Sequence, residues 1–194
     1  MAPNTRDMPH VPLLMVRPHL AGLPVCPLPA GYRLRGFRAG DETVWATLWH
    51  RVGEFATEAD ALARFTREFL PEPAETASRC LMLETDAGQA IGTGTAWYDR
   101  AFYGADAGRV HWIAIDPACH GRGLGKPLVA AVLARLAISH ARAYLATHTG
   151  CRRAIGIYLD FGFTPACDRP DSVAVWRTLA AEMGHPALAG FRGL

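Results

Sequence analysis

A glycine-rich loop between a predicted strand and a predicted helix constrains this chain most. Glycine recurs there at alternate positions, at Gly121, Gly123 and Gly125. The apolar segment 109–115 precedes the loop, and a helical pattern follows it to about His140. Alternate glycines let the backbone turn tightly and let a ligand approach without a Cβ in the way. Because the first amides of a helix have no partner within it and attract anions, we expect a pyrophosphate-binding loop.

Two common nucleotide-binding loops do not match these residues. The dinucleotide pattern requires a third glycine five positions after the first, but Lys126 stands there when the pattern starts at Gly121, and the other register also fails. A P-loop requires a glycine five residues before its Gly-Lys pair and a hydroxyl after it. This chain has His120 and Pro127 at those places. Both nucleotide interpretations therefore fail on residue type.

Composition favours one globular domain and excludes several classes of protein. The chain has 194 residues, 50% of them hydrophobic, which is enough for a sizeable core. Its formal net charge of +2 argues against nucleic-acid binding by bulk positive charge. Its apolar runs are too short to span a membrane. Five widely spaced cysteines without a CxxC pair argue against a disulfide framework or a metal site, and favour a cytoplasmic protein.

The remaining patterns predict a mixed sheet with helices on both faces, an α/β (α+β) fold. We expect strands at 32–38, 80–85, 89–99, 143–147, 163–167 and 172–177. We expect helices after Gly40-Asp41 and over 58–70 and 152–161. Residues 100–108 are expected to form a loop. The helix over 58–70 is expected to end at Pro71 and Pro73.

The N-terminal thirty residues contain seven of the fourteen prolines. Because proline fixes φ and lacks an N–H, we expect an extended arm there, neither a helix nor a central strand. The arm is apolar enough to pack on the domain or on a second subunit, which would make the protein a homodimer. The expected organisation is an arm at 1–30, one domain at 31–180 and a C-terminal tail at 181–194.

The loop resembles the coenzyme A loop of the GCN5-related N-acetyltransferase (GNAT) superfamily. The family pattern is Gln or Arg, then any two residues, Gly, any one residue, and Gly or Ala. Segment 120–125 is similar to this pattern, with Gly123 and Gly125 at the two small positions and His120 at the Gln/Arg position. A second segment, 154–163, resembles the family's Ala-x-x-x-Tyr-x-x-x-Gly-Phe, with Cys151 where an asparagine is common. The resemblance covers 32–177 and implies a GNAT-like, mostly antiparallel, twisted sheet.

The resemblance implies acetyl-CoA as the cofactor. Its pyrophosphate would lie on the amides of the loop, and its pantetheine would run along strand 109–115 like an added strand. A strand amide near Ile113–Ala114 would meet the thioester carbonyl and stabilise the oxyanion. The cofactor-binding residues implied are Ile113, Ala114, Ile115, His120, Gly121, Arg122, Gly123, Leu124, Gly125, Lys126 and Cys151.

Acetyl transfer to an amine requires a general acid and a general base. Tyr158 matches the family's tyrosine, which commonly serves as the acid. Some relatives place a glutamate base where this chain has Arg109, so His111, on the same face of the strand, is our candidate base. It is equally open that His111 is a packed core residue and that Asp99, Glu54 or a chain of waters is the base.

Several other residue types are better explained by packing. Trp45 and Trp49 lie four residues apart and Phe55 follows, a spacing more typical of core than of an acceptor-binding cage. Cys119 and Cys151 flank the expected cofactor, but neither has a histidine in triad-like context, so both are interpreted as small fillers.

The function implied is acetyl-CoA-dependent N-acetylation of a primary amine on a small molecule or peptide, by direct attack on the thioester. The alternative is a non-catalytic acyl-CoA-binding domain of the same fold, which Arg109 and Cys151 favour slightly. In either case no nucleic-acid or membrane partner is expected.

Overall fold

A computed structural model describes residues 10–191 of the chain. Within them the chain forms seven strands and six α-helices. It divides into two compact units, a larger one over Pro18–Ala143 and a smaller one that joins the segment up to Arg17 to the chain from Tyr144 onwards. Residues 1–9 of the expected arm and 192–194 of the expected tail lie outside the described residues.

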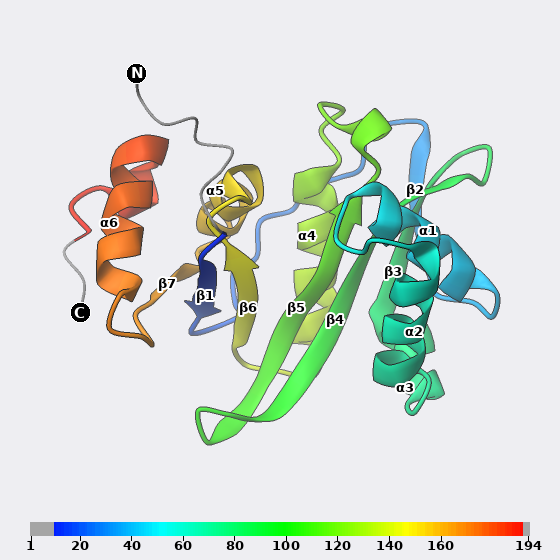
Figure 1. Ribbon diagram of the computed structural model, residues 1–194, viewed down its shortest axis with the longest axis horizontal. Coiled ribbons are helices and arrows are strands. Elements are labelled where there is room, and N and C mark those ends of the chain that lie inside the picture. The colour runs from blue at the N-terminus through cyan, green and yellow to red at the C-terminus, as the bar shows by residue number, and fades with distance from the viewer. Residues whose placement is uncertain (1–9, 192–194) are drawn as a thin grey trace. The chain divides into compact units, whose positions relative to one another are not determined.

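The larger unit contains an antiparallel sheet. Its strands lie side by side in the order β2 (Tyr32–Gly36), β3 (Cys80–Thr85), β4 (Ala90–Phe102) and β5 (Ala105–Ile115) (Figure 1). Each neighbouring pair is antiparallel, which confirms the expected predominance of antiparallel strands. The helices are α1 (Asp41–Arg51), α2 (Glu58–Phe69), α3 (Pro73–Arg79) and α4 (Gly125–Ala137).

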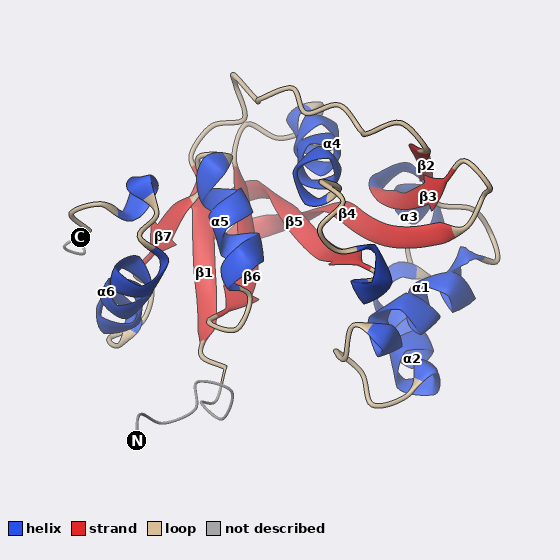
Figure 2. Cartoon of the chain, turned by 90° about the horizontal axis from the view of Figure 1, so that it is seen from above, coloured by secondary structure: helices blue, strands red, loops and turns tan. Residues whose placement is uncertain are grey.

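Helices cover both faces of this sheet, as expected (Figure 2). On one face, the buried rings of Trp45 from α1 and Phe65 and Phe69 from α2 pack in one cluster with Trp97 of β4. On the other face, α4 buries its apolar stripe against β4 and β5, where Leu128 and Val132 reach Gly94. The glycine loop therefore connects a strand of this sheet, β5, to a helix that packs on it, α4.

The smaller unit contains β6 (Ala143–His148), β1 (Pro12–Arg17) and β7 (Thr164–Ala166), in that order across the sheet. The expectation that the proline-rich segment contains no central strand is wrong for β1, which lies between the other two and pairs antiparallel with β7. Pro12 is the first residue of β1 and Pro18 follows its last, so neither proline lies inside the strand, where a missing N–H would break the hydrogen-bond ladder. Helices α5 (Arg152–Asp160) and α6 (Ser172–Met183) complete this unit.

Two predicted elements are wrong for identifiable reasons. The expected strand 172–177 is the start of α6, because Trp176 and Leu179 are three residues apart and both are buried. The expected loop 100–108 is a tight hairpin between β4 and β5, in which Tyr103 and Gly104 have φ of 47° and 77°. Tyrosine rarely adopts a positive φ, so this turn carries no recognisable sequence signal.

The helix α3 is absent from the sequence prediction, which assigns Pro71 and Pro73 only to the end of the preceding helix. Pro73 is the first residue of α3, where the absence of an N–H costs nothing. The expected helices α1, α2, α4 and α5 and the strands β2, β3 and β6 are confirmed, with ends that shift by up to three residues. Across residues 10–191, none of the helices has the length and apolar character that crossing a bilayer requires.

Candidate active site

The turn after β5 is held by Asp116. Its carboxylate accepts a hydrogen bond from the Ala118 amide at 2.9 Å and forms an ion pair with Arg51 Nη1 of α1 at 3.0 Å. The bond from Ala118, and then the pair with Arg51, keep the pKa of the Asp116 carboxyl below its ordinary value. A charged side chain therefore fixes the point at which β5 ends and the glycine loop begins.

The loop itself presents backbone with little side chain over it. Gly121 and Gly123 have φ of 80° and 76°, in the left-handed region. A Cβ at Gly121 would have nothing within 4 Å, and one at Gly123 would meet only Pro29, at 4.0 Å. The amides that start α4 follow at Gly125. An exposed, glycine-lined helix start of this kind fits a pyrophosphate.

A small apolar cluster anchors the loop from one side. Leu124 and Cys119 are buried in the cluster, and Leu28 of the N-terminal segment packs against it. The interpretation of Cys119 as a small filler is thus confirmed. Leu124, expected among the cofactor-binding residues, is only 2% exposed as a whole residue, and its side chain packs in this cluster.

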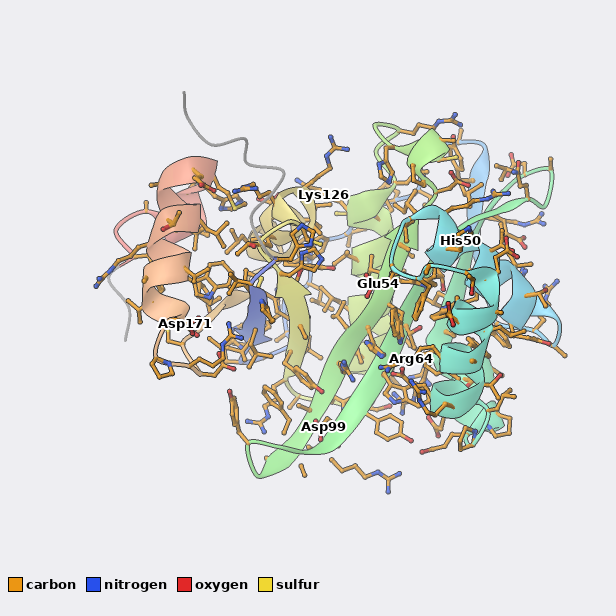
Figure 3. All side chains as sticks on the ribbon, viewed as in Figure 1. His50, Glu54, Arg64, Asp99, Lys126 and Asp171 are labelled. Atoms are coloured by element: carbon orange, nitrogen blue, oxygen red, sulfur yellow. The ribbon has the colours of Figure 1, made fainter. Side chains whose placement is uncertain are left out.

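Three polar side chains lie on or beside the loop. His120 Nε2 donates to the Ile115 carbonyl at 2.9 Å, so the ring closes the turn. Arg122 donates to the Tyr32 hydroxyl and to the Ala118 carbonyl, both at 3.2 Å. Lys126 is exposed in the first turn of α4 (Figure 3). Two cations therefore accompany the loop amides.

A β-bulge interrupts β5 just before the loop. Thr95 of β4 is opposite His111 and Thr93 is opposite Ala114, so β5 has one residue more than β4 between these pairs. Trp112 lies in this interval with φ of 49°, a strained value for an aromatic residue. Bulges leave backbone groups outside the ladder and cluster at functional sites. The bulge adjoins Ile113–Ala114, where the resemblance implies an amide that meets the thioester.

His111 lies beside the carboxylate of Glu68, a residue that no sequence pattern indicates as part of a site. Its Nε2 is hydrogen-bonded to Glu68 Oε1 of α2, and the other carboxylate oxygen accepts from Arg64 Nε at 2.8 Å. Burial lowers the pKa of the His111 imidazole, and Glu68 opposes this effect. Although burial of Glu68 favours its protonated form, the hydrogen bond from His111 and the ion pair with Arg64 keep the pKa of its carboxyl below the ordinary value. At neutral pH we therefore expect a neutral imidazole next to an ionised carboxylate.

Tyr158 and Cys151 belong to the smaller unit, unlike the other predicted site residues. Tyr158, on α5, is 7% exposed, and burial raises the pKa of its phenol above the ordinary value. Cys151 precedes α5, and its Sγ lies 3.3 Å from Nε2 of His148. From the sequence, Cys151 is interpreted as a small filler with no histidine in triad-like context, and the structure adds a contact to that interpretation, because the turn after β6 brings His148 beside the sulfur.

The tryptophan pair of α1 and the two carboxylates considered as bases lie in different surroundings. Trp45 and Trp49 are 0% and 7% exposed, so the core interpretation is confirmed. Asp99 lies near the end of the β4–β5 hairpin, where its carboxylate accepts from the Ala101 amide at 2.9 Å (Figure 3). Glu54 is exposed in the turn after α1.

Replacing Asp116 with alanine is expected to lower the free energy of unfolding by about 1 kcal/mol at neutral pH, because a cap and an ion pair are lost. The pKa of Asp116 is lower in the folded state than in the unfolded state. The ionised carboxylate therefore stabilises the fold fully at a pH above its unfolded pKa, and this stabilisation is lost as the pH falls through its folded pKa. Urea unfolding of both proteins at neutral and acidic pH measures this. Asp86→Ala, in an exposed turn, is the control. If wild type and Asp116→Ala still differed in free energy of unfolding at acidic pH, the ionised carboxylate of Asp116 would not be the cause of the stabilisation.

Comparisons with known proteins are consistent with this geometry. The family model described as "Acetyltransferase (GNAT) family" matches residues 45–163. A mycothiol acetyltransferase of Salinispora tropica is 33% identical over 157 residues, 76% of this chain and 49% of that protein. A second mycothiol acetyltransferase, from Salinispora arenicola, is 36% identical over 62% of this chain and 40% of its own length. The chain thus spans about half or less of the curated relatives that it matches.

Solved structures show the same fold. A GCN5-related N-acetyltransferase from Sphaerobacter thermophilus superposes with a TM-score of 0.63 at 19% identity, over 81% of this chain and 49% of that one. Glucosamine-6-phosphate N-acetyltransferase from Arabidopsis thaliana superposes with a TM-score of 0.52 at 15% identity, over 71% of this chain and 95% of that one.

Proposed function

The chain belongs to the GNAT family of acetyltransferases, and on that premise we propose that it transfers an acetyl group from acetyl-CoA to a primary amine of a small molecule or peptide. The five cysteines are all free thiols, which supports a reducing compartment such as the cytoplasm.

One observation carries the proposal: a bulged strand, an open glycine loop and a helix start follow one another within β5 and α4. The amides from His120 to Lys126 would hold the pyrophosphate, with Arg122 and Lys126 as cations beside it. The backbone around Ile113, Ala114 and Ile115 would hold the pantetheine arm. Bound acetyl-CoA supplies the acetyl thioester as the electrophile. Cys151 lies just before α5, at the position where the family commonly has an asparagine that contacts the cofactor arm, and we include it among the cofactor-binding residues although cysteine weakens that contact.

Two of the proton transfers require a protein group. The acceptor ammonium must first lose a proton to become a nucleophilic amine, and the thiolate must gain a proton as the C–N bond forms and the C–S bond breaks, while the excess proton on the acylated nitrogen goes to solvent. We assign the first proton to His111, whose lowered pKa leaves it neutral and able to accept at neutral pH. We assign the second to Tyr158, whose raised pKa keeps its phenol protonated.

Two measurements on the same protein test this proposal. The first is release of free CoA thiol from acetyl-CoA in the presence of a panel of amines. The panel includes the free-amine form of mycothiol, because the curated relatives are named for that compound. The second is calorimetric titration with CoA.

We expect binding and turnover together. Binding without turnover on any amine would favour the alternative, a non-catalytic acyl-CoA-binding domain. Absence of binding would overturn the proposal.

A further inference from the structure

We propose that Glu68 is a positioning residue that holds the His111 ring in one tautomer, with Nε2 protonated and Nδ1 available to accept the proton of the acceptor ammonium. The role of His111 in proton transfer rests on the proposed function, whereas the contact between Glu68 and His111 does not depend on it. Glu68 lies on α2 and His111 on β5, 43 residues apart in the chain.

The carboxylate of Glu68 is held at both oxygens. Oε1 is hydrogen-bonded to His111 Nε2, and Oε2 accepts from Arg64 Nε at 2.8 Å. The guanidinium of Arg64 in turn lies over the Trp112 ring, 5.5 Å from its centroid. Both partners of the central contact are largely buried, with side-chain exposures of 10% for His111 and 16% for Glu68. A carboxylate restrained in this way cannot follow a rotating imidazole, so it selects one orientation of the ring.

The chemistry of the two groups decides which nitrogen carries the proton. An ionised carboxylate has only acceptor oxygens, so the ring nitrogen that it contacts must donate. In a neutral imidazole the other nitrogen then has a lone pair. Nδ1 of His111 can therefore take one proton from the acceptor ammonium, which leaves a neutral amine and an imidazolium. The negative charge of Glu68 stabilises that imidazolium, as a carboxylate does in catalytic triads.

The charges around His111 keep its resting state neutral. From α2, Glu68 favours the imidazolium and Arg64 disfavours it, and from β5 Arg109 also disfavours it. Opposite His111 on β4 stands the uncharged Thr95, and the rings of Phe69 and Trp112 lie near the imidazole. Burial adds the largest effect, and it acts in the same direction as the two arginines. The base is thus unprotonated when the acceptor arrives.

The first test is nitrogen-15 NMR of histidine-labelled wild-type protein without ligands. It reports which nitrogen of His111 is protonated, and assignment is made by comparison with His111→Gln. We expect an Nε2–H tautomer. An Nδ1–H tautomer, or a ring that stays protonated at neutral pH, would overturn the inference whether or not the protein has activity.

The second test is the pH profile of kcat/KM for Glu68→Gln. Loss of the carboxylate charge is expected to lower the plateau about 10²-fold or more, because the amide no longer enforces the tautomer. It also removes a charge that favours the imidazolium, so the acid limb is expected to move to lower pH by about one unit. An unmoved limb with an unchanged plateau would refute the role of Glu68.

The matched control is Glu75→Gln. Glu75 also pairs with an arginine four residues away in a helix, Arg79 of α3, but it does not contact His111. We expect the control to keep the wild-type profile. Should wild type show no acetyl transfer to any amine, the proposed function fails, while the NMR result still decides the tautomer.

Discussion

Replacing Gly123 with glutamate is expected to abolish measurable CoA binding, with a loss of affinity of about 10³-fold or more. Gly123 has φ of 76° in an exposed loop, so any side chain there is strained. The introduced carboxylate would also stand among the amides that we assign to the pyrophosphate and would repel it. Calorimetric titration with CoA measures the change directly.

Gly104→Glu is the matched control for this variant. Gly104 has φ of 77°, and a Cβ there would have nothing within 4 Å, so the substitution introduces the same strain and charge. It lies in the β4–β5 hairpin, away from the loop in sequence. We expect it to leave CoA affinity within twofold of wild type. Undiminished affinity in Gly123→Glu would show that the cofactor loop is placed wrongly.

Replacing Tyr158 with phenylalanine is expected to lower kcat by about 10²-fold or more while CoA affinity stays nearly constant. The substitution removes only the hydroxyl of a buried side chain, so the packing of its ring near Phe163 is preserved. Loss of the proton donor acts in the step that releases the thiolate and has little effect on binding. Steady-state kinetics and CoA titration on the same preparation separate the two quantities.

Tyr103→Phe is the control, since Tyr103 is 66% exposed in the β4–β5 turn and is assigned no role in the reaction. Turnover within a factor of two of wild type in Tyr158→Phe would exclude that hydroxyl as the acid. Because burial raises the pKa of Tyr158, kcat of the wild type should not fall through ionisation of this phenol until pH exceeds its ordinary value of about 10.

Prediction from sequence succeeded where local patterns match local structure. The apolar periodicity of α2 and α4 is visible in the chain because each helix buries one face. It failed where proline and β-branched residues have more than one use. Pro73 starts a helix, Pro12 begins and Pro18 follows a strand whose alternate residues are buried, and the valines of α6 belong to a helix. Local propensity cannot separate these outcomes, because the burial that decides them comes from distant residues.

In the candidate site too, some features are predictable from consecutive residues and others depend on tertiary contacts. The chain alone predicts the glycine loop that we propose binds the cofactor, because the positive φ of Gly121 and Gly123 and the helix start after them are local properties of consecutive residues. Only the tertiary structure reveals the contact between Glu68 and His111 and the bulge at Trp112. The first joins residues 43 positions apart, and the second arises from the register of β4 against β5. Both depend on how the sheet and α2 pack, and packing is decided by the whole core at once.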